Sequence, residues 1–271
     1  MLRKYQKIIL PILMGGTAFY CFQKTFSNHK FPVSELKIIK FANALTNESN
    51  LFKPLSRLTE VVEIVQPSVV KVFNAGTEMS GGSGFVFDES GYILTCAHVI
   101  QDEHDTLVRV HSGETFKAHV IMKDDPMDLA LIKINSGKLK LKSLKFESHT
   151  SIKVGELALA LGNYLSTTSA TMGVVSGTER YGSLFAYKNV KYIQTDALIQ
   201  PGFSGGPLVN LHGKVIGMSC MYFDGIGGFA ISSEYCTKFI KHINVHGYLS
   251  IIKTKFSRDP FIGRIPDRKP N

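Results

Sequence analysis

Cysteine is scarce in this 271-residue chain, and its spacing does not indicate a disulfide framework. Cys21 lies near the N-terminus, and Cys96, Cys220 and Cys236 lie in the body of the chain, with no C-x-x-C motif. Three cysteines cannot all pair with one another inside the body. This scarcity favours a thiol-reducing or intermediate compartment over a disulfide-rich secreted scaffold.

Metal-ligand patterns are also missing. His242 and His246 have the i, i+4 spacing of a helical metal site, but no acidic residue or cysteine lies nearby in the sequence. We expect both to be surface helix residues. The sequence therefore predicts no metal site and no cofactor.

No apolar run reaches the ~20 residues that cross a bilayer comfortably. The longest N-terminal run, residues 8–22, contains Pro11, and no small-x-small cleavage pattern follows it. No acidic residue precedes Glu35, which suits a mitochondrial presequence or a short membrane anchor. We expect a mitochondrial protein of the intermembrane space, or one anchored to a membrane through residues 8–22. A secretory route is the alternative.

The net positive charge of the chain comes from its two ends. The formal net charge is +9, with +6 in residues 1–40, +4 in residues 253–271 and −1 in residues 41–252. Binding to a nucleic-acid phosphate backbone requires clustered positive charge. The body of the chain is nearly neutral, so we expect no nucleic-acid partner.

Between residues 59 and 245 the sequence lacks the alternation of strands and amphipathic helices that a parallel sheet requires. Short runs rich in Val, Ile and Leu, bounded by Gly, Asp, Asn or Ser, predict strands instead. They cover residues 69–73, 84–88, 92–95, 106–110, 116–122, 129–134, 157–161, 173–176, 192–195, 207–210, 215–219 and 228–231. This pattern indicates an all-β barrel or sandwich with a short N-terminal helix at 61–65 and a C-terminal helix at 233–242.

One stretch, TDALIQPGFSGGPLVN at residues 195–210, has the composition of a nucleophile turn. Ser204 lies between Gly202 and Gly205, whose missing Cβ atoms allow a tight turn and let a substrate carbonyl approach the backbone N–H groups. Gly/Ser turns are common, so this pattern needs a base and an acid elsewhere in the chain.

The chain supplies both at strand ends. His98 follows the predicted strand 92–95, and Asp128 precedes the apolar strand 129–134. A carboxylate in such a place needs a hydrogen-bond partner. The order His98, Asp128, Ser204 is that of the chymotrypsin-type triad. The nucleophile elbow of α/β-hydrolases is the competing interpretation, but it requires a helix after the serine and a later acid and histidine.

Three segments together resemble the HtrA (DegP-like) family of trypsin-fold serine proteases. They are GSGFVFDESGYILTCAHVI, DLALIKI and TDALIQPGFSGGPLVNLHGKVIGM, and NVKYIQTDALI is most similar to the mitochondrial members. The resemblance covers residues 59–243 and implies a trypsin-like double β-barrel with the triad His98, Asp128 and Ser204 in the cleft between the barrels.

The resemblance also implies roles for neighbouring residues. The N–H groups of Gly202 and Ser204, helped by that of Phe203, would form the oxyanion hole. An extended substrate would pair with the strand formed by Gly217, Met218, Ser219 and Cys220. The implied activity is an ATP-independent serine endopeptidase that cleaves unfolded or damaged proteins, with some preference for apolar residues before the cut.

Three features depart from the family pattern. Phe203 stands where HtrA proteins usually have Asn, and its bulk raises the alternative of a catalytically silent peptide-binding homologue. Only 28 residues follow residue 243, too few for the family's PDZ domain. Leu55 and Arg57 replace the aromatic residues that support the family's homotrimer, which makes a trimer less certain.

These observations predict three regions. Residues 1–58 form a leader or membrane anchor with a linker, residues 59–245 the protease domain, and residues 246–271 a basic tail that stops before a PDZ domain. A third hypothesis, a membrane adaptor acting through its basic tails, requires that protease activity be absent.

Overall fold

The computed structural model describes residues 53–77, 80–164, 167–180, 190–245 and 264–265. The chain divides into two compact units, Met1–Arg57 and Leu58–Asn271, and the strands of the described residues lie in the second. The predicted leader, including residues 8–22 and Cys21, lies outside the described residues, as do His246 and most of the basic tail.

The first half of the larger unit is a closed antiparallel barrel. Its strands follow the order β1-β2-β3-β6-β5-β4, and pairing of β5 with β6 closes it. The bounds are β1 Val69–Asn74, β2 Gly82–Asp88, β3 Tyr92–Thr95, β4 Thr106–Arg109, β5 Thr115–Asp124 and β6 Leu129–Ile134. A two-residue strand, β13 (Arg264–Ile265), pairs with β5.

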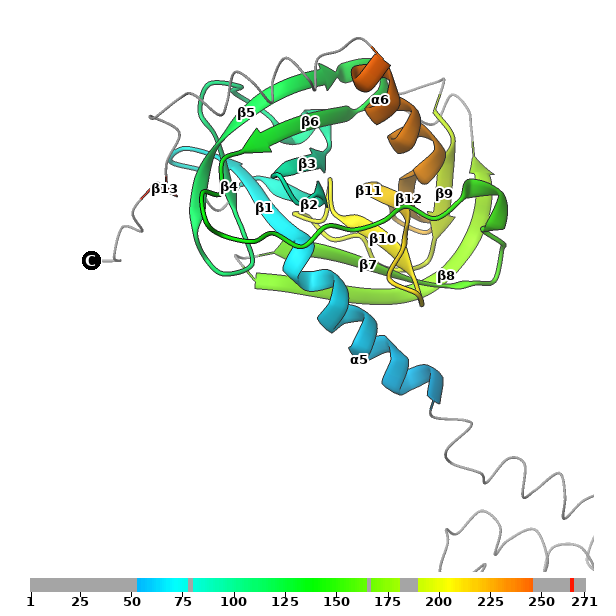
Figure 1. Cartoon of the computed structure of the whole chain (residues 1–271). Helices are drawn as coiled ribbons and strands as arrows, with labels where there is room; N and C mark the ends of the chain where they lie inside the picture. Colours follow the sequence, from blue (N-terminus) through cyan, green and yellow to red (C-terminus); the bar gives the residue numbers. More distant parts are fainter. Residues whose placement is uncertain (1–52, 78–79, 165–166, 181–189, 246–263, 266–271) are drawn as a thin grey trace, which may run out of the picture. The chain divides into compact units, whose positions relative to one another are not determined.

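The second half is another closed antiparallel barrel, in the order β10-β11-β12-β9-β8-β7. Its strands are β7 Leu157–Tyr164, β8 Thr167–Arg180, β9 Tyr192–Thr195, β10 Pro207–Asn210, β11 Val215–Phe223 and β12 Gly227–Ser232. The two barrels lie side by side, with β7 against β1 and β2 (Figure 1). The predicted trypsin-like double barrel is confirmed.

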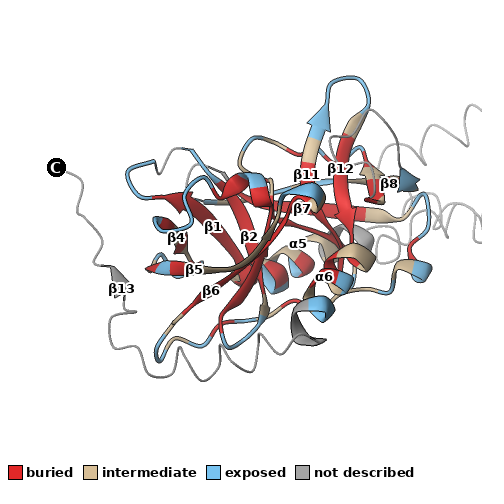
Figure 2. Cartoon of the chain, turned by 90° about the horizontal axis from the view of Figure 1, so that it is seen from above, coloured by how far each residue is buried: buried red, intermediate tan, exposed pale blue. Residues whose placement is uncertain are grey.

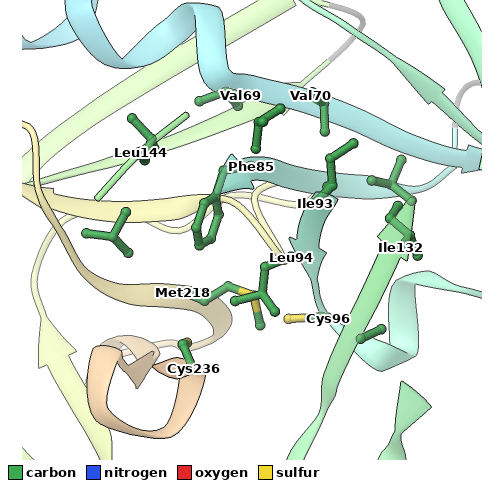
Figure 3. Close-up of a cluster of buried hydrophobic side chains, with 14 of the residues drawn as sticks. Val69, Val70, Phe85, Ile93, Leu94, Cys96, Ile132, Leu144, Met218 and Cys236 are labelled. Carbon is green, nitrogen blue, oxygen red and sulfur yellow. The ribbon is translucent and has the colours of Figure 1, made fainter. Parts of the chain in front are cut away.

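The barrel strands carry the buried residues, as the red ribbons of Figure 2 show. Every residue of β1 and β6 is buried, which is why these strands read as nearly continuous apolar runs. One core cluster joins both barrels, with Phe85, Leu94 and Met218 side by side in Figure 3. A smaller cluster, the second core, fills the second barrel with Ile152, Ala158, Ala160, Val175, Ile193, Ala197, Ile199, Phe203, Leu208, Ile216 and Ala230.

Two helices accompany the barrels. Helix α5 spans Lys53–Val65, longer than the predicted 61–65, and buries Val61 and Val65. Helix α6 spans Ser233–Val245 and packs on β11, β12 and β6, so it touches both barrels. None of the helices in the described ranges combines the length and apolarity needed to cross a membrane.

The two largest extensions beyond the predicted strand ends are in β8 and β11, and in both strands pairing sets the length. The predicted strand 173–176 is the middle of β8, which pairs with β7 from Thr167 to Val174 through mostly polar residues. The predicted strand 215–219 continues to Phe223 because β12 pairs with β11 from Gly217 to Phe223. In β8 the polar residues of the paired ladder carry no hydrophobic signal.

Candidate active site

The register of β3 and β6 brings the predicted base and acid together. Thr95 lies opposite Ala130, and one step further the Ala97 N–H donates to the Asp128 carbonyl oxygen at 3.2 Å. His98 lies in the short 3₁₀ turn η2 (Ala97–Val99), directly after β3. Residues 30 positions apart in the chain therefore meet at one edge of one sheet.

His98 and Asp128 form a close pair in which Asp128 is buried and His98 is half-exposed. The His98 Nδ1 lies 2.8 Å from Oδ2 and 3.0 Å from Oδ1 of Asp128, and the His98 backbone N–H donates to Oδ1 at 2.9 Å. The Asp128 side chain is fully buried, whereas that of His98 is 45 % exposed. Because Nδ1 faces the carboxylate, the neutral ring leaves Nε2 as its proton acceptor.

Asp128 has an unusual backbone and an ionised carboxylate. It caps the 3₁₀ turn η3 (Asp125–Met127) with φ 54° and ψ 38°, and it is the one non-glycine residue with positive φ among those described. Burial raises the pKa of Asp128, but hydrogen bonds from His98 and Cys220 and the His98 charge hold it below its usual value. The carboxylate therefore stays charged in a buried place.

The Ser204 hydroxyl lies on a turn whose conformation depends on glycine. The Phe203 N–H donates to the Gln200 carbonyl oxygen at 2.9 Å, and Gly202 has φ +92°. This is the conformation that a type II turn requires at its third position. Within the described chain, no residue accepts a hydrogen bond from the N–H of Gly202 or Ser204, whereas the Phe203 N–H is occupied by Gln200.

Ser83 of the first barrel fastens this turn of the second barrel. Its hydroxyl donates to the Gly202 carbonyl at 2.6 Å and accepts from the Asn163 N–H at 2.7 Å. Its own N–H donates to the Ser204 carbonyl at 2.8 Å. The sequence analysis assigned no role to Ser83, and no local sequence signal identifies a contact across 119 positions.

Phe203 points away from the turn and into the second core. Its side chain is fully buried, and a Cβ atom at Gly162 would come within 2.6 Å of its ring and 2.7 Å of its Cα. Gly162 thus provides the space that the phenyl ring occupies. The large side chain of Phe203, which suggested a disturbed oxyanion turn, therefore packs beneath the turn in the second core.

Cys220 links the serine to the acid. The Ser204 Oγ donates to the Cys220 carbonyl oxygen at 3.1 Å, and the Cys220 thiol contacts Asp128 Oδ2 at 3.0 Å. Free Cys96 and Cys220 are both buried, and their sulfurs and the Asp128 carboxylate oxygen lie within 4.8 Å of one another. Sequence spacing gave no sign of this donor cluster, because its three members come from separate segments: after β3, before β6 and within β11.

The predicted substrate strand is corrected by the pairing of β11. Gly217 and Met218 pair with β12 on one side and with β10 on the other, and Ser219 is bonded to Gly205 and Gly206. The backbone groups of these three residues are already paired on both sides of the strand, so they cannot pair with a substrate peptide. Met221 and Tyr222 pair with β12 alone among the described residues. The error arose because barrel closure, which occupies both edges, is not visible in the sequence.

The edge of β11 that β10 leaves uncovered therefore runs from Cys220 to Tyr222. Cys220 is the one residue of the predicted set that belongs to it. Tyr222 and Phe223 are exposed and Met221 is partly buried.

Of the two histidines predicted to lie on a helix surface, His242 is an exposed residue of α6.

Comparison with known proteins agrees with this geometry. Residues 82–218 match the family model of the trypsin-like peptidase domain. The serine protease HTRA1B of Danio rerio is 37 % identical over 204 residues, covering 72 % of this chain and 43 % of the relative. The probable periplasmic serine endoprotease DegP-like of Chlamydia trachomatis is 38 % identical over 149 residues, covering 55 % and 29 %.

Solved structures show the same relationship. The HtrA-type protease AlgW, solved with a tripeptide, is 31 % identical with a TM-score of 0.63, covering 70 % of this chain and 64 % of that one. The serine endoprotease of Yersinia pestis is also 31 % identical, with a TM-score of 0.59, covering 68 % and 65 %. The chain spans less than half the length of the curated relatives cited above. It belongs to the HtrA family of trypsin-like serine proteases.

Proposed function

We propose that this chain is a serine endopeptidase that cleaves peptide bonds through Ser204, His98 and Asp128. The observation that carries the proposal is the buried Asp128 carboxylate held 2.8 Å from His98 Nδ1, with the Ser204 hydroxyl joined to the same cluster through Cys220. Ser204 Oγ attacks the scissile carbonyl while His98 takes its proton through Nε2 and later delivers it to the leaving amine.

Asp128 supports this proton transfer in two ways. It holds the His98 ring in the tautomer that leaves Nε2 free to accept, and its negative charge stabilises the imidazolium that forms. The resting Ser204 hydroxyl donates to Cys220, so it turns toward His98 before attack. Catalytic hydrogen bonds are often made only in the substrate complex.

The N–H groups of Gly202 and Ser204 are the proposed oxyanion donors. Both are without a partner among the described residues, and the type II turn that presents them is held by Ser83. One such donor contributes about 3 kcal/mol to the transition state. The Phe203 N–H, which the sequence analysis included, is left out because it donates to Gln200.

The substrate is proposed to be an extended or unfolded polypeptide that adds a strand to the free edge of β11. The edge from Cys220 to Tyr222 begins where the Ser204 hydroxyl donates to the strand. An added strand would therefore pass the nucleophile, and backbone pairing recognises chain conformation more than side chains. A requirement for unfolded or damaged proteins, with an apolar preference before the cut, fits this mode of binding.

A fluorophosphonate probe tests the proposal. Wild-type protein should be labelled at Ser204 and should cleave casein without ATP. Ser204→Ala should lose both properties, while Ser80→Ala, an exposed serine of the first barrel, should keep both. Absence of labelling, together with identical casein cleavage by wild type and Ser204→Ala, would overturn the assignment.

A silent peptide-binding homologue was the alternative because of Phe203. Since this side chain packs into the second core over Gly162, no observation at the site favours it. The probe experiment separates the two functions, because a silent homologue would bind casein without labelling or turnover.

Location, assembly and domain limits are proposed from the sequence. The basic, acid-poor residues 1–40 support a mitochondrial or membrane-attached location, and the family supports a homotrimer. The protease domain is proposed to cover residues 59–245. Imaging of the tagged full chain and its mass in solution test the first two.

A further inference from the structure

Two thiols lie beneath the proposed active site and have no assigned chemistry. Cys96 follows β3 in the first barrel, Cys220 lies in β11 of the second, and Asp128 precedes β6. One donor atom from each lies within 4.8 Å of the other two, and all three residues are buried. Figure 3 places Cys96 at the junction of the barrels, next to Leu94 and Met218.

This donor set matches the coordination chemistry of zinc. Zn²⁺ binds cysteine sulfur at about 2.3 Å and carboxylate oxygen at about 2.0–2.2 Å, so donors of a tetrahedral site lie roughly 3.5–3.8 Å apart. Cys220 Sγ already lies 3.0 Å from Asp128 Oδ2, and the whole set spans at most 4.8 Å. Side-chain adjustments of about an ångström would bring the donors to these bond lengths.

We propose that Cys96, Cys220 and Asp128 form a site for Zn²⁺ that switches off the neighbouring histidine. Zinc takes the carboxylate oxygen that now lies 2.8 Å from His98 Nδ1. Two Cys–Zn bonds and one Asp–Zn bond form, and the thiol protons leave to solvent. His98 then loses the negative charge that orients its ring and stabilises its protonated form. The binding stands without peptidase activity, whereas the inhibition rests on the proposed function.

The surroundings of the cluster explain both its access and its selectivity. His98 is half-exposed directly over buried Asp128, so a rotation of its ring opens a route from solvent. Hard cations such as Mg²⁺ and Ca²⁺ prefer all-oxygen sites, and two thiolates exclude them. The cluster therefore selects a thiophilic divalent cation.

Cobalt binding is the direct test, since Co²⁺ substitutes for Zn²⁺ and gives thiolate-to-metal charge-transfer absorption. The full chain, reduced with a phosphine and freed of metal by a chelator, should bind one equivalent of Co²⁺ with this absorption. Added Zn²⁺ should abolish it. Cys96→Ala should lose the signal, whereas Cys236→Ala and Cys21→Ala, which remove cysteines outside the cluster, should keep it.

Activity gives the second readout. Zn²⁺ should inhibit casein cleavage by the wild type, and Cys96→Ala should keep its basal activity. Its half-inhibitory zinc concentration should rise at least about 100-fold, more than the roughly 10–100-fold that loss of an outer-shell partner costs. Mg²⁺ should inhibit neither protein.

Three results would overturn the site. Wild type could show no charge-transfer absorption, or Cys96→Ala could keep the absorption and the inhibition unchanged, which would place zinc elsewhere on the chain. Loss of both thiols to a Cys96–Cys220 disulfide under peroxide, without cobalt binding, would assign the pair to redox chemistry. Failure of the protease itself would appear differently, as cobalt binding with no casein cleavage in any variant.

Discussion

The two barrels contribute to the proposed active site in different ways. The first barrel holds His98 and Asp128 at the adjoining ends of β3 and β6, so its contribution follows from the register of one strand pair. The second presents Ser204 on a turn whose conformation depends on contacts outside the turn. Ser83 of the first barrel donates a hydrogen bond to the turn, and Gly162 leaves the space that the Phe203 ring fills. One half of the site is thus set by pairing, and the other by packing between and within the barrels.

The largest expected effect comes from breaking the pair in the first barrel. Asp128→Asn should lower kcat by about 10⁴-fold, the loss known for this change in the triad template. Asn tolerates the left-handed backbone conformation at this position, so the fold should survive. Steady-state kinetics on a peptide substrate would measure the loss.

A matched control lies on the same turn. Asp124 accepts a hydrogen bond from the Met127 N–H, whereas His98 is bonded to Asp128. Asn caps such turns as well as Asp does, so Asp124→Asn should keep near wild-type kcat. Equal losses in the two variants would mean that the charge near the turn, and not the contact with His98, matters.

The packing of the second barrel is broken most sharply at Gly162. In Gly162→Ala the new Cβ would lie 2.7 Å from the Phe203 Cα, which is backbone, so the turn must move. Displacement of one oxyanion donor should lower kcat by about 10²–10³-fold. Gly155→Ala, where a Cβ meets nothing within 4 Å but φ is +90°, controls for backbone strain alone. Unchanged kcat in Gly162→Ala would contradict the proposed support.

The contact between the barrels should have a moderate effect. The Ser83 hydroxyl donates to the Gly202 carbonyl and accepts from the Asn163 N–H, and Ser83→Ala removes both hydrogen bonds. Leaving a buried polar group unpaired costs about 1–3 kcal/mol. We expect the free energy of unfolding to fall by that order and kcat by roughly tenfold, if the turn loosens by about 1.4 kcal/mol in the transition state. Denaturant unfolding and kinetics measure the two.

Ser80→Ala provides the comparison for this change. Its hydroxyl is exposed and donates to the neighbouring Thr77 carbonyl, so both stability and kcat should stay near wild type. A loss of stability in Ser83→Ala without any loss of kcat would show that the contact holds the barrels together but does not position the turn.

The smallest expected effect is a pH dependence of stability. The pKa of Asp128 lies below its usual value in the folded chain, so its ionised form stabilises the fold above the unfolded pKa of about 3.9. This contribution is lost as pH falls through the lower folded pKa. Unfolding measured from pH 6 to pH 3 should decline more steeply for wild type than for Asp128→Asn. Identical declines would exclude the contribution.

The fold was predictable, and the three proposed catalytic residues could be named, because their signals are local. Each strand carries its own apolar run between turn residues, and the structure places a strand at each of the twelve predicted positions. Ser204 has its glycines beside it, and His98 and Asp128 stand at the ends of apolar runs. Signals of this kind depend only on neighbours in the chain.

The substrate edge, the role of Phe203 and the thiol cluster were not predictable in this way. Gly217 and Met218 looked available until barrel closure occupied both sides of β11. Phe203 looked obstructive until Gly162, 41 positions earlier, made room for it. Cys96 and Cys220 show no motif because 124 positions separate them.

The sequence by itself determined that this is an all-β chain with a histidine, an aspartate and a serine in the order of a trypsin-like protease. Those features follow from local periodicity and from residue chemistry. Only the tertiary structure decided which edge is free for a peptide, what fastens the serine turn, and that two thiols lie against the buried carboxylate. Hydrogen bonds and packing between strands far apart in the chain fix these relations, and the residues of a single segment do not encode them.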